Sequence, residues 1–196
     1  MDIIFIIISY LIGSVPFSWI IAKKFAGIEL WEEGEGNVGA RNVYHLMGLK
    51  YGFAAGFADF SKGFAVALMG KALSLSVPLI WLSGLVALAG HQFPIYLRFK
   101  GGKGAALAFG FLTFLFPMPM LLAFMVMAVL KLFKAGFHLT ISAGFATLPI
   151  LWMPIFKYSI TDSVLVIIFL LVPGVKRILD QSHMKEVRAR TGWKHE

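Results

Sequence analysis

A stretch of glycines and cations, RFKGGKGAALAFG at residues 98–110, is the part of the sequence best suited to hold an anion. It is followed by an apolar run that predicts a helix. The positive end of a helix dipole, together with free amides in the first turn, favours a bound anion such as phosphate. We therefore expect a phosphate-binding turn made of Lys100, Gly101, Gly102, Lys103 and Gly104.

This turn does not match a Walker nucleotide loop. That loop needs a glycine separated by four residues from Gly-Lys-Ser/Thr, whereas here Leu97 and Gly104 occupy the glycine and hydroxyl positions, so no hydroxyl can hold Mg²⁺. The alternative interpretation is a positively charged cytoplasmic flank of a membrane helix, with the glycines as a hinge. That alternative accounts for the cations, but less well for three glycines around the single Lys103.

The segment EEGEGNVGARNVYH, inside a long loop at residues 23–50, is the second candidate. Gly34, Gly36 and Gly39 spell GxGxxG, but a dinucleotide site needs this pattern between a strand and a helix of a βαβ unit. Here the pattern lies between two apolar segments, so we reject a nucleotide site.

The same loop can still bind an anion in another way. Its glycines can leave backbone amides exposed as an anion-binding nest. Asn37 and Asn42 would add amide donors, and Arg41 would add a planar guanidinium suited to phosphate. The alternative is a plain Gly/Asn turn that joins two helices.

Three polar side chains fall in apolar segments. Asp59 and Lys62 are three residues apart and would share a helix face, so they form either a mutual ion pair or part of a substrate site. His91 ends another apolar segment just before the Gly-Lys turn. It is either a buried, hydrogen-bonded structural residue or a substrate contact.

Several kinds of chemistry are not expected. The sequence has no Cys, so it can form neither disulfides nor a thiol nucleophile. It has no GxSxG motif, and we expect neither a metal nor another cofactor, because no metal-ligand spacing links His45, His138, His183 and His195.

The composition indicates an all-α polytopic membrane protein. Of 196 residues, 59% are hydrophobic and 14% are charged, and the mean hydropathy is +0.81. Typical soluble domains are about 45–50% apolar and about 25% charged. The net charge of +8 suits anionic lipids or phosphorylated substrates, and no basic module supports a nucleic-acid partner.

The hydropathy pattern predicts membrane-spanning helices of about 20 apolar residues each. Pro117 and Pro119 interrupt a long segment, which we expect to form two short helices or one kinked helix. The predicted spans are 2–22, 51–70, 75–96, 104–130 (as 104–116 and 118–130), 136–156 and 159–175.

Lysine and arginine decide between these two possibilities. With two short helices there are seven transmembrane helices, with the N-terminus outside and the C-terminus cytoplasmic. Only Lys71 and Lys157 then lie outside and Lys62 lies in a span, which leaves fifteen of the 18 Lys and Arg residues cytoplasmic. One kinked helix would instead divide the Lys and Arg residues almost evenly between the two sides of the membrane.

We expect residues 1–196 to form a single membrane domain, ending in a basic tail at 176–196. The tail is either a solvated charged end or an anchor on the inner leaflet.

The motifs resemble those of the bacterial membrane acyl-phosphate:glycerol-3-phosphate acyltransferases, the PlsY family. The resemblance rests on LIGSVPFSWIIAK, GEGNVGARNV, DFSKG and AGHQFPIYLRFKGGKGAA, and it covers roughly the first 110 residues. Beyond residue 110 the likeness is mostly one of hydropathy. The family also has seven helices with the N-terminus outside.

The resemblance implies that an acyl chain moves from acyl phosphate to glycerol 3-phosphate in a bacterial cytoplasmic (inner) membrane. Acyl phosphate is already activated, so positioning and electrostatics supply most of the catalysis. By resemblance, Lys103 and the turn 101–104 bind phosphate, whereas Gly36, Asn37, Gly39 and Asn42 shape the first loop. The oligomeric state stays open, and a monomer is compatible with the sequence.

The chain departs from the family pattern GSGNxGATNVxR in its first loop. Glu35 replaces a serine, Arg41 replaces a threonine and His45 replaces an arginine. Arg41 can supply the guanidinium from a shifted position, and we expect Lys103, Arg41 and His45 to act in catalysis. His183 and Arg188 are rough counterparts of the family's C-terminal motif. The departures leave open an alternative, a non-catalytic lipid- or phosphate-binding membrane protein or a small transporter.

Overall fold

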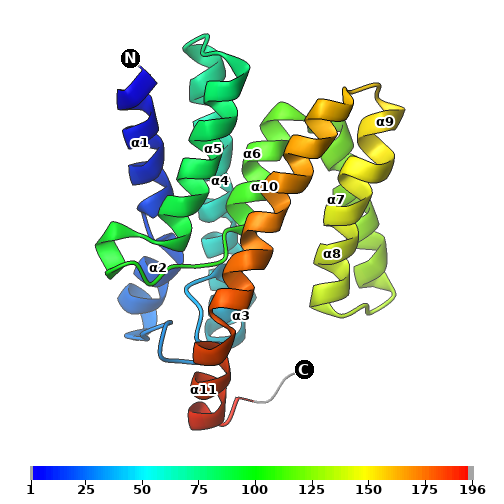
Figure 1. Ribbon diagram of the computed structural model, residues 1–196. Helices are drawn as coiled ribbons and strands as arrows, with labels where there is room; N and C mark the ends of the chain where they lie inside the picture. Colours follow the sequence, from blue (N-terminus) through cyan, green and yellow to red (C-terminus); the bar gives the residue numbers. More distant parts are fainter. Residues whose placement is uncertain (1, 194–196) are drawn as a thin grey trace.

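A computed structural model describes residues 2–193, and within that range the chain forms helices and loops without a strand. The longest helices lie roughly parallel, and the ends of the described chain lie at opposite ends of the bundle (Figure 1). The first half of the chain contains α1 (Asp2–Ser14), α2 (Phe17–Ala26), α3 (Ala40–Met47), α4 (Leu49–Ala72) and α5 (Val77–Gln92). The all-α prediction is confirmed.

The first predicted span, 2–22, is wrong as a single helix. α1 ends at Ser14 and α2 begins at Phe17, because Pro16 has no backbone N–H to continue the hydrogen-bond ladder. The break leaves the carbonyl oxygens of Gly13 and Val15 without helical partners, and both accept hydrogen bonds from Lys62 Nζ, at 3.0 and 2.7 Å. A lysine of α4 therefore holds the break in the first span.

The segment with two prolines forms two helices, as predicted. α6 (Ala105–Leu115) ends just before Pro117, which starts α7 (Pro117–Leu132). The remaining elements are a 3₁₀ turn η1 (Ile95–Leu97), α8 (Phe137–Thr147), a π-helical turn η2 (Leu148–Trp152), α9 (Met153–Ile155), α10 (Ile160–Leu179) and α11 (Gln181–Thr191). In Figure 1, α7 to α9 form a group beside the main bundle.

By length and composition, two helical stretches could cross a membrane: Asp2–Ala26, which includes the break, and Val77–Leu97. Shorter apolar helices cover Ala105–Leu115, Pro117–Leu132 and Leu139–Ile155. Large apolar side chains are exposed on the outside of the bundle, such as Phe53 on α4 and Leu171 on α10.

Glycines allow two of the central helices, α4 and α6, to approach closely. A Cβ at Gly110 of α6 or Gly63 of α4 would overlap the backbone of the other helix, so these two helices cross with their main chains in contact. The core beside this crossing is aromatic, with Trp81, Phe111 and Phe169 stacked or tilted against one another at centroid distances of 4.9–5.7 Å. This rigid core fixes the ends of α4, α5 and α6, from which the polar residues project.

Within its described part, 176–193, the basic tail is largely helical, with the side chains of Arg177, Lys185 and Arg190 exposed. Lys176 ends α10 in a buried ion pair with Asp180, at 2.5 Å. α11 buries Met184 and Val187, and Val187 packs against Gly36 of the loop that precedes α3. The tail therefore packs against the first loop.

Candidate functional site

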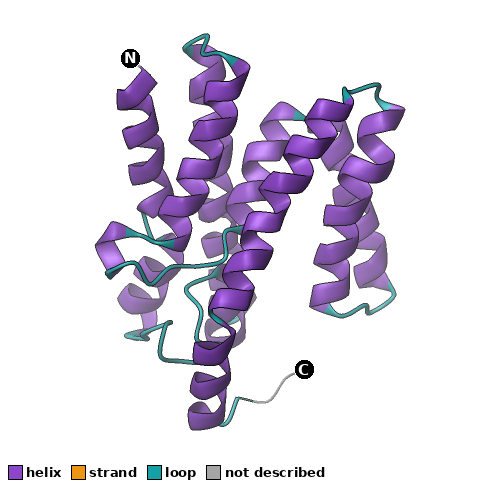
Figure 2. Cartoon of the chain, in the orientation of Figure 1, coloured by secondary structure: helices purple, strands orange, loops and turns teal. Residues whose placement is uncertain are grey.

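The loop before α3 and the glycine-rich turn before α6 meet at one end of the bundle, where loops cross between helices (Figure 2). Gly102 lies at the meeting point. A Cβ there would be 2.5 Å from both Nε2 of His91 and the carbonyl oxygen of Val38. Only glycine therefore lets the turn, the end of α5 and the first loop approach one another this closely.

Four charged or titratable side chains gather at this junction, which we name the loop cluster: Glu35, Arg41, His45 and Lys103. Glu35 lies at its centre, 1% exposed. Its Oε1 is 3.0 Å from Arg41 Nη1 and 3.7 Å from His45 Nε2, and its Oε2 is 4.0 Å from Lys103 Nζ. The structure thus brings together the three residues predicted to be catalytic.

Asn42 holds the first loop in shape and does not face a ligand. It is fully buried, and its side-chain amide donates to the carbonyl oxygens of Leu30, Glu33 and Asn37. Its Oδ1 accepts a hydrogen bond of 2.9 Å from the Glu35 amide. Asn42 therefore fixes the backbone that carries the Glu35 carboxylate.

The predicted nest of free amides in this loop is wrong. The amides of Gly36 and Gly39 donate to the carbonyl oxygens of Glu33 and Asn37, both at 3.0 Å, and the Glu35 amide is bound to Asn42. Gly36 is needed for its φ of +65° and for the close contact with Val187. The loop accordingly presents side-chain cations instead of amides.

In the turn, the prediction of free amides is wrong for Gly102. The amide of Gly102 is not free, because it donates to the carbonyl oxygen of His91 at 3.1 Å. Gln92 holds the next residue, donating from Nε2 to the carbonyl oxygen of Lys103 at 2.8 Å. Gly104 adopts a φ of +91° that turns the chain into α6. These contacts anchor the backbone of Lys103 while its ammonium faces Glu35.

Burial lowers the pKa of two cations of the loop cluster. It lowers the pKa of Lys103 from 10.5 to about 8, with the positive charges of Arg177, Arg41 and Arg188 adding to the effect and Glu35 opposing it. Burial also lowers the pKa of Arg41, again against the opposing charge of Glu35. Several positive charges therefore lie close to Lys103, and such a surrounding favours an anion.

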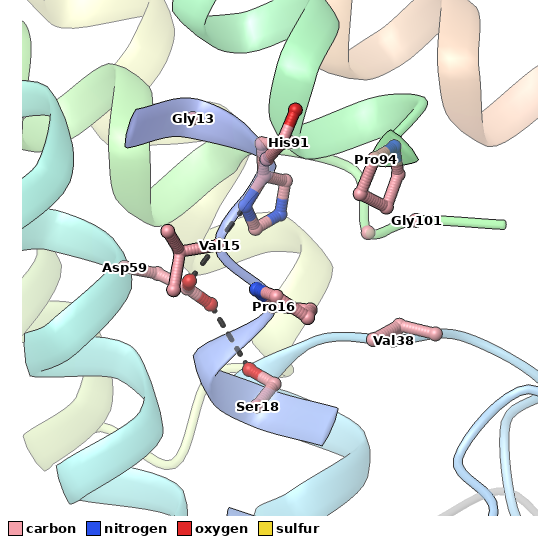
Figure 3. Close-up of a pocket in the computed structure, with 11 residues that line it drawn as sticks. Gly13, Val15, Pro16, Ser18, Val38, Asp59, His91, Pro94 and Gly101 are labelled. Atoms are coloured by element: carbon pink, nitrogen blue, oxygen red, sulfur yellow. Dashed lines mark hydrogen bonds and ion pairs between the residues drawn. The ribbon is translucent and has the colours of Figure 1, made fainter. Parts of the chain in front are cut away.

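A second polar group lies next to the loop cluster, and we name it the buried cluster: Ser18, Asp59, Lys62 and His91. Asp59 accepts a hydrogen bond from Ser18 at 2.9 Å and pairs with Lys62 at 2.9 Å, whereas His91 Nδ1 is 3.1 Å from Lys62 Nζ. Figure 3 shows Asp59 between Ser18 and His91, facing a cavity of about 10 Å³. A cavity of this size is too small for a phosphate ester.

The C-terminal helices close over the first loop. The His183 ring stacks on Trp31 at 4.3 Å, its Nε2 lies 2.9 Å from the Trp31 carbonyl oxygen, and Arg190 pairs with Glu32 at 2.7 Å. The ammonium of Lys100 also lies over the Trp31 ring, 5.9 Å from its centroid. His183 and Lys100 thus lie near the loop cluster, because both contact Trp31. Arg188 adds positive charge near Lys103.

Sequence reasoning missed some of these positions. Glu35 was noticed as a departure from a family pattern, but its place at the centre of three cations depends on the tertiary meeting of loop and turn. The positions 41 and 45 are four apart and share a helix face, which was a usable signal. Trp31, Lys176 and Asp180 carried no motif, because their contacts join distant parts of the chain.

Comparisons with known proteins agree with the geometry. A family model described as glycerol-3-phosphate acyltransferase matches residues 3–185. The chain is 36% identical over 193 residues to "Glycerol-3-phosphate acyltransferase 2" of Bacillus anthracis, covering 95% of this chain and all of that protein. It is 40% identical over 144 residues to the glycerol-3-phosphate acyltransferase of Aquifex aeolicus, covering 70% of this chain and 74% of that protein.

Two solved structures share the fold over the whole chain. One is PlsY (YgiH), described as an integral membrane glycerol 3-phosphate acyltransferase in its glycerol 3-phosphate form, with a TM-score of 0.81 and 30% identity over 94% of its length. The other is the same enzyme in its lysophosphatidic acid form, with a TM-score of 0.78 and 28% identity.

Proposed function

The chain belongs to the glycerol-3-phosphate acyltransferase family, and we propose that it transfers a fatty acyl chain from acyl phosphate to glycerol 3-phosphate, giving lysophosphatidic acid and phosphate. The loop cluster carries the proposal: Lys103 and Arg41 approach one point from two separate segments, as two substrate phosphates require. The relatives act on the same acceptor by name.

The chemistry requires little more than binding and alignment. Lys103 and Arg41 hold the phosphates, and their charge stabilises the electron pair that the leaving phosphate takes with it. Holding both substrates at one junction turns a bimolecular reaction into an effectively intramolecular one. His45 lies on the same helix face as Arg41, with its Nε2 3.7 Å from Oε1 of Glu35.

The remaining predicted site residues fall into two roles. Most shape the site or line its edge, as their hydrogen bonds and packing suggest: Gly36, Asn37, Gly39, Asn42, Gly101, Gly102, Gly104, Lys100, His183 and Arg188. The second role is to hold the turn in place. It belongs to Asp59, Lys62 and His91, because Gly102 packs directly on His91.

We place the protein in the cytoplasmic (inner) membrane of a bacterium as one domain over 1–196. Seven spans, with the N-terminus outside and the C-terminus cytoplasmic, put the loop cluster on the cytoplasmic side, where a phosphorylated acceptor is made. The excess of Lys and Arg in the loops on that side supports this orientation. The residues lining the site come from one chain, so a monomer suffices.

The test is turnover of palmitoyl phosphate and glycerol 3-phosphate by the purified protein in detergent or lipid. Wild-type protein should produce lysophosphatidic acid, and Lys103→Ala should lower kcat/KM by about 100-fold or more, because an aligned cation is lost. Lys71→Ala, at the far end of α4, is the matched control and should behave as wild type.

Two results would contradict the proposal. One is the absence of lysophosphatidic acid from wild-type protein under both conditions. The other is uptake of labelled glycerol 3-phosphate into sealed vesicles without acyl donor, which would indicate a transporter.

A further inference from the structure

Glu35 is a carboxylate at the centre of a site that we propose binds phosphates. Its carboxylate is 1% exposed and faces Arg41, His45 and Lys103. A residue that only packed the loop would not need to be charged, and a residue that only neutralised Arg41 would not need to reach Lys103. The position of this carboxylate therefore calls for a chemical explanation.

The two oxygens of the carboxylate differ. Oε1 is paired with Arg41 Nη1 at 3.0 Å. Oε2 is buried and has no hydrogen-bond donor among the described residues; its nearest cation, Lys103 Nζ, is 4.0 Å away. A carboxylate oxygen carries two lone pairs, and leaving a buried one without a donor is unfavourable.

The missing donor is best supplied by a hydroxyl. Lys103 faces the same oxygen, so a phosphate held by Lys103 lies beside Oε2. A hydroxyl donating to a carboxylate lies about 2.5–2.7 Å from it, and a polyol phosphate carries hydroxyls within a few bonds of its phosphate. The acceptor substrate therefore brings the donor that Oε2 lacks.

Resting on the proposed function, we infer that Glu35 is a catalytic general base, whose Oε2 accepts the proton of the acceptor hydroxyl as that hydroxyl attacks the acyl phosphate. Asn42 is then a positioning residue, because it holds the Glu35 amide at 2.9 Å.

The step balances without any further reactant. The acceptor oxygen forms an ester bond to the acyl carbon, and the bond from that carbon to the phosphate oxygen breaks. The phosphate leaves with the bonding electron pair, and the hydroxyl proton passes to Glu35 Oε2. Glu35 then gives the proton to the departing phosphate or to water, which restores the carboxylate.

The carboxylate does not cancel the attraction for phosphates. Several groups face the Glu35–Lys103 pair from the surrounding elements: Arg41 and His45 from α3, Arg177 from α10 and Arg188 from α11. Lys103 and Arg41 thus lie close to Glu35 from two different segments, so cations surround the carboxylate while it serves as a base.

The experiment compares wild type with Glu35→Gln, which keeps the shape of the side chain and removes its basicity. We expect kcat to fall by about 100-fold or more, with the KM of either substrate changed by less than about 3-fold. Formate should restore part of the activity of Glu35→Ala by replacing the lost base.

Controls separate this inference from folding and from the proposed function. Glu33→Gln makes the same change at an exposed position of the same loop and should match wild type. Binding of glycerol 3-phosphate to Glu35→Gln reports that the site is folded. Full turnover by a folded Glu35→Gln, or faster turnover because a carboxylate no longer blocks a phosphate, overturns the inference alone. An inactive wild type overturns the proposed function as well.

Discussion

The loop cluster and the buried cluster contain almost the same kinds of side chain, an acid, a lysine and a histidine, yet they differ in how closely the acid is paired. In the buried cluster Asp59 Oδ2 accepts a hydrogen bond from Ser18 at 2.9 Å. Asp59 Oδ1 has no hydrogen bond among the described residues, but it lies 2.9 Å from Lys62 Nζ in an ion pair, and Lys62 also donates to two carbonyl oxygens of the broken first span. In the loop cluster, Lys103 is 4.0 Å from Glu35 and Oε2 lacks a donor within residues 2–193.

This difference distinguishes the buried cluster, which supports the fold, from the loop cluster, which can bind a ligand. A buried carboxylate in close contact with its cation has little left to offer a ligand, whereas one whose nearest cation is 4.0 Å away can accept a further donor. Asp59 and Lys62 were predicted as substrate contacts or as a mutual pair, and the geometry favours the pair. Their role in acyl transfer is then indirect, through the position of His91 under Gly102.

The largest effect that would test this contrast is on stability. Asp59→Ala leaves the ammonium of Lys62 buried without its acid and should lower the free energy of unfolding by about 3–5 kcal/mol, measured as thermal unfolding in detergent. The double variant Asp59→Leu with Lys62→Met should lose less. A stable Asp59→Ala protein that lost turnover would move Asp59 into the substrate site.

A smaller effect should come from pH, and it belongs to the loop cluster. Lys103 binds phosphate in its protonated form, which predominates below its pKa of about 8. Raising the pH through 8 should therefore lower kcat/KM by up to 10-fold per unit, whereas both substrate phosphates stay fully ionised. kcat should change less, because a bound phosphate keeps the lysine protonated. A flat kcat/KM between pH 7 and 9.5 would contradict this assignment.

The smallest effect is expected at the edge of the site. Arg190→Ala removes an exposed ion pair with Glu32, whose pKa that arginine lowers. Exposed ion pairs contribute little, so turnover should change by less than about 2-fold. Because α11 also holds the loop through the stacking of His183 on Trp31, the helix should stay in place. A 10-fold loss would show that Arg190 contributes directly to the site.

The sequence predicted much of the fold because proline and apolar length act locally. Pro117 ended one helix and began another as expected, since a missing N–H has its effect within one turn. Pro16 has the same chemistry but was overlooked, because the apolar run continued across it. The lysine that binds the freed carbonyls comes from α4, and no local pattern could indicate it.

The site was predicted in its residues but not in its hydrogen bonds. Arg41, His45 and Lys103 do meet, and glycine motifs drew attention to both segments. Among the loop amides, those of Glu35, Gly36 and Gly102 instead donate to Asn42 Oδ1 and to the carbonyl oxygens of Glu33 and His91. Which partner a loop amide finds depends on what packs beside it, and a single sequence does not contain that information.

The contact between α11 and the first loop has a consequence for biosynthesis. Trp31 and Glu32 meet partners 152 and 158 residues later in the chain, at His183 and Arg190. During translation the first loop leaves the ribosome long before those partners exist. Until then its shape depends on the bonds made by Asn42, so the junction between the first loop and α11 is assembled in two stages, the second of them when α11 emerges.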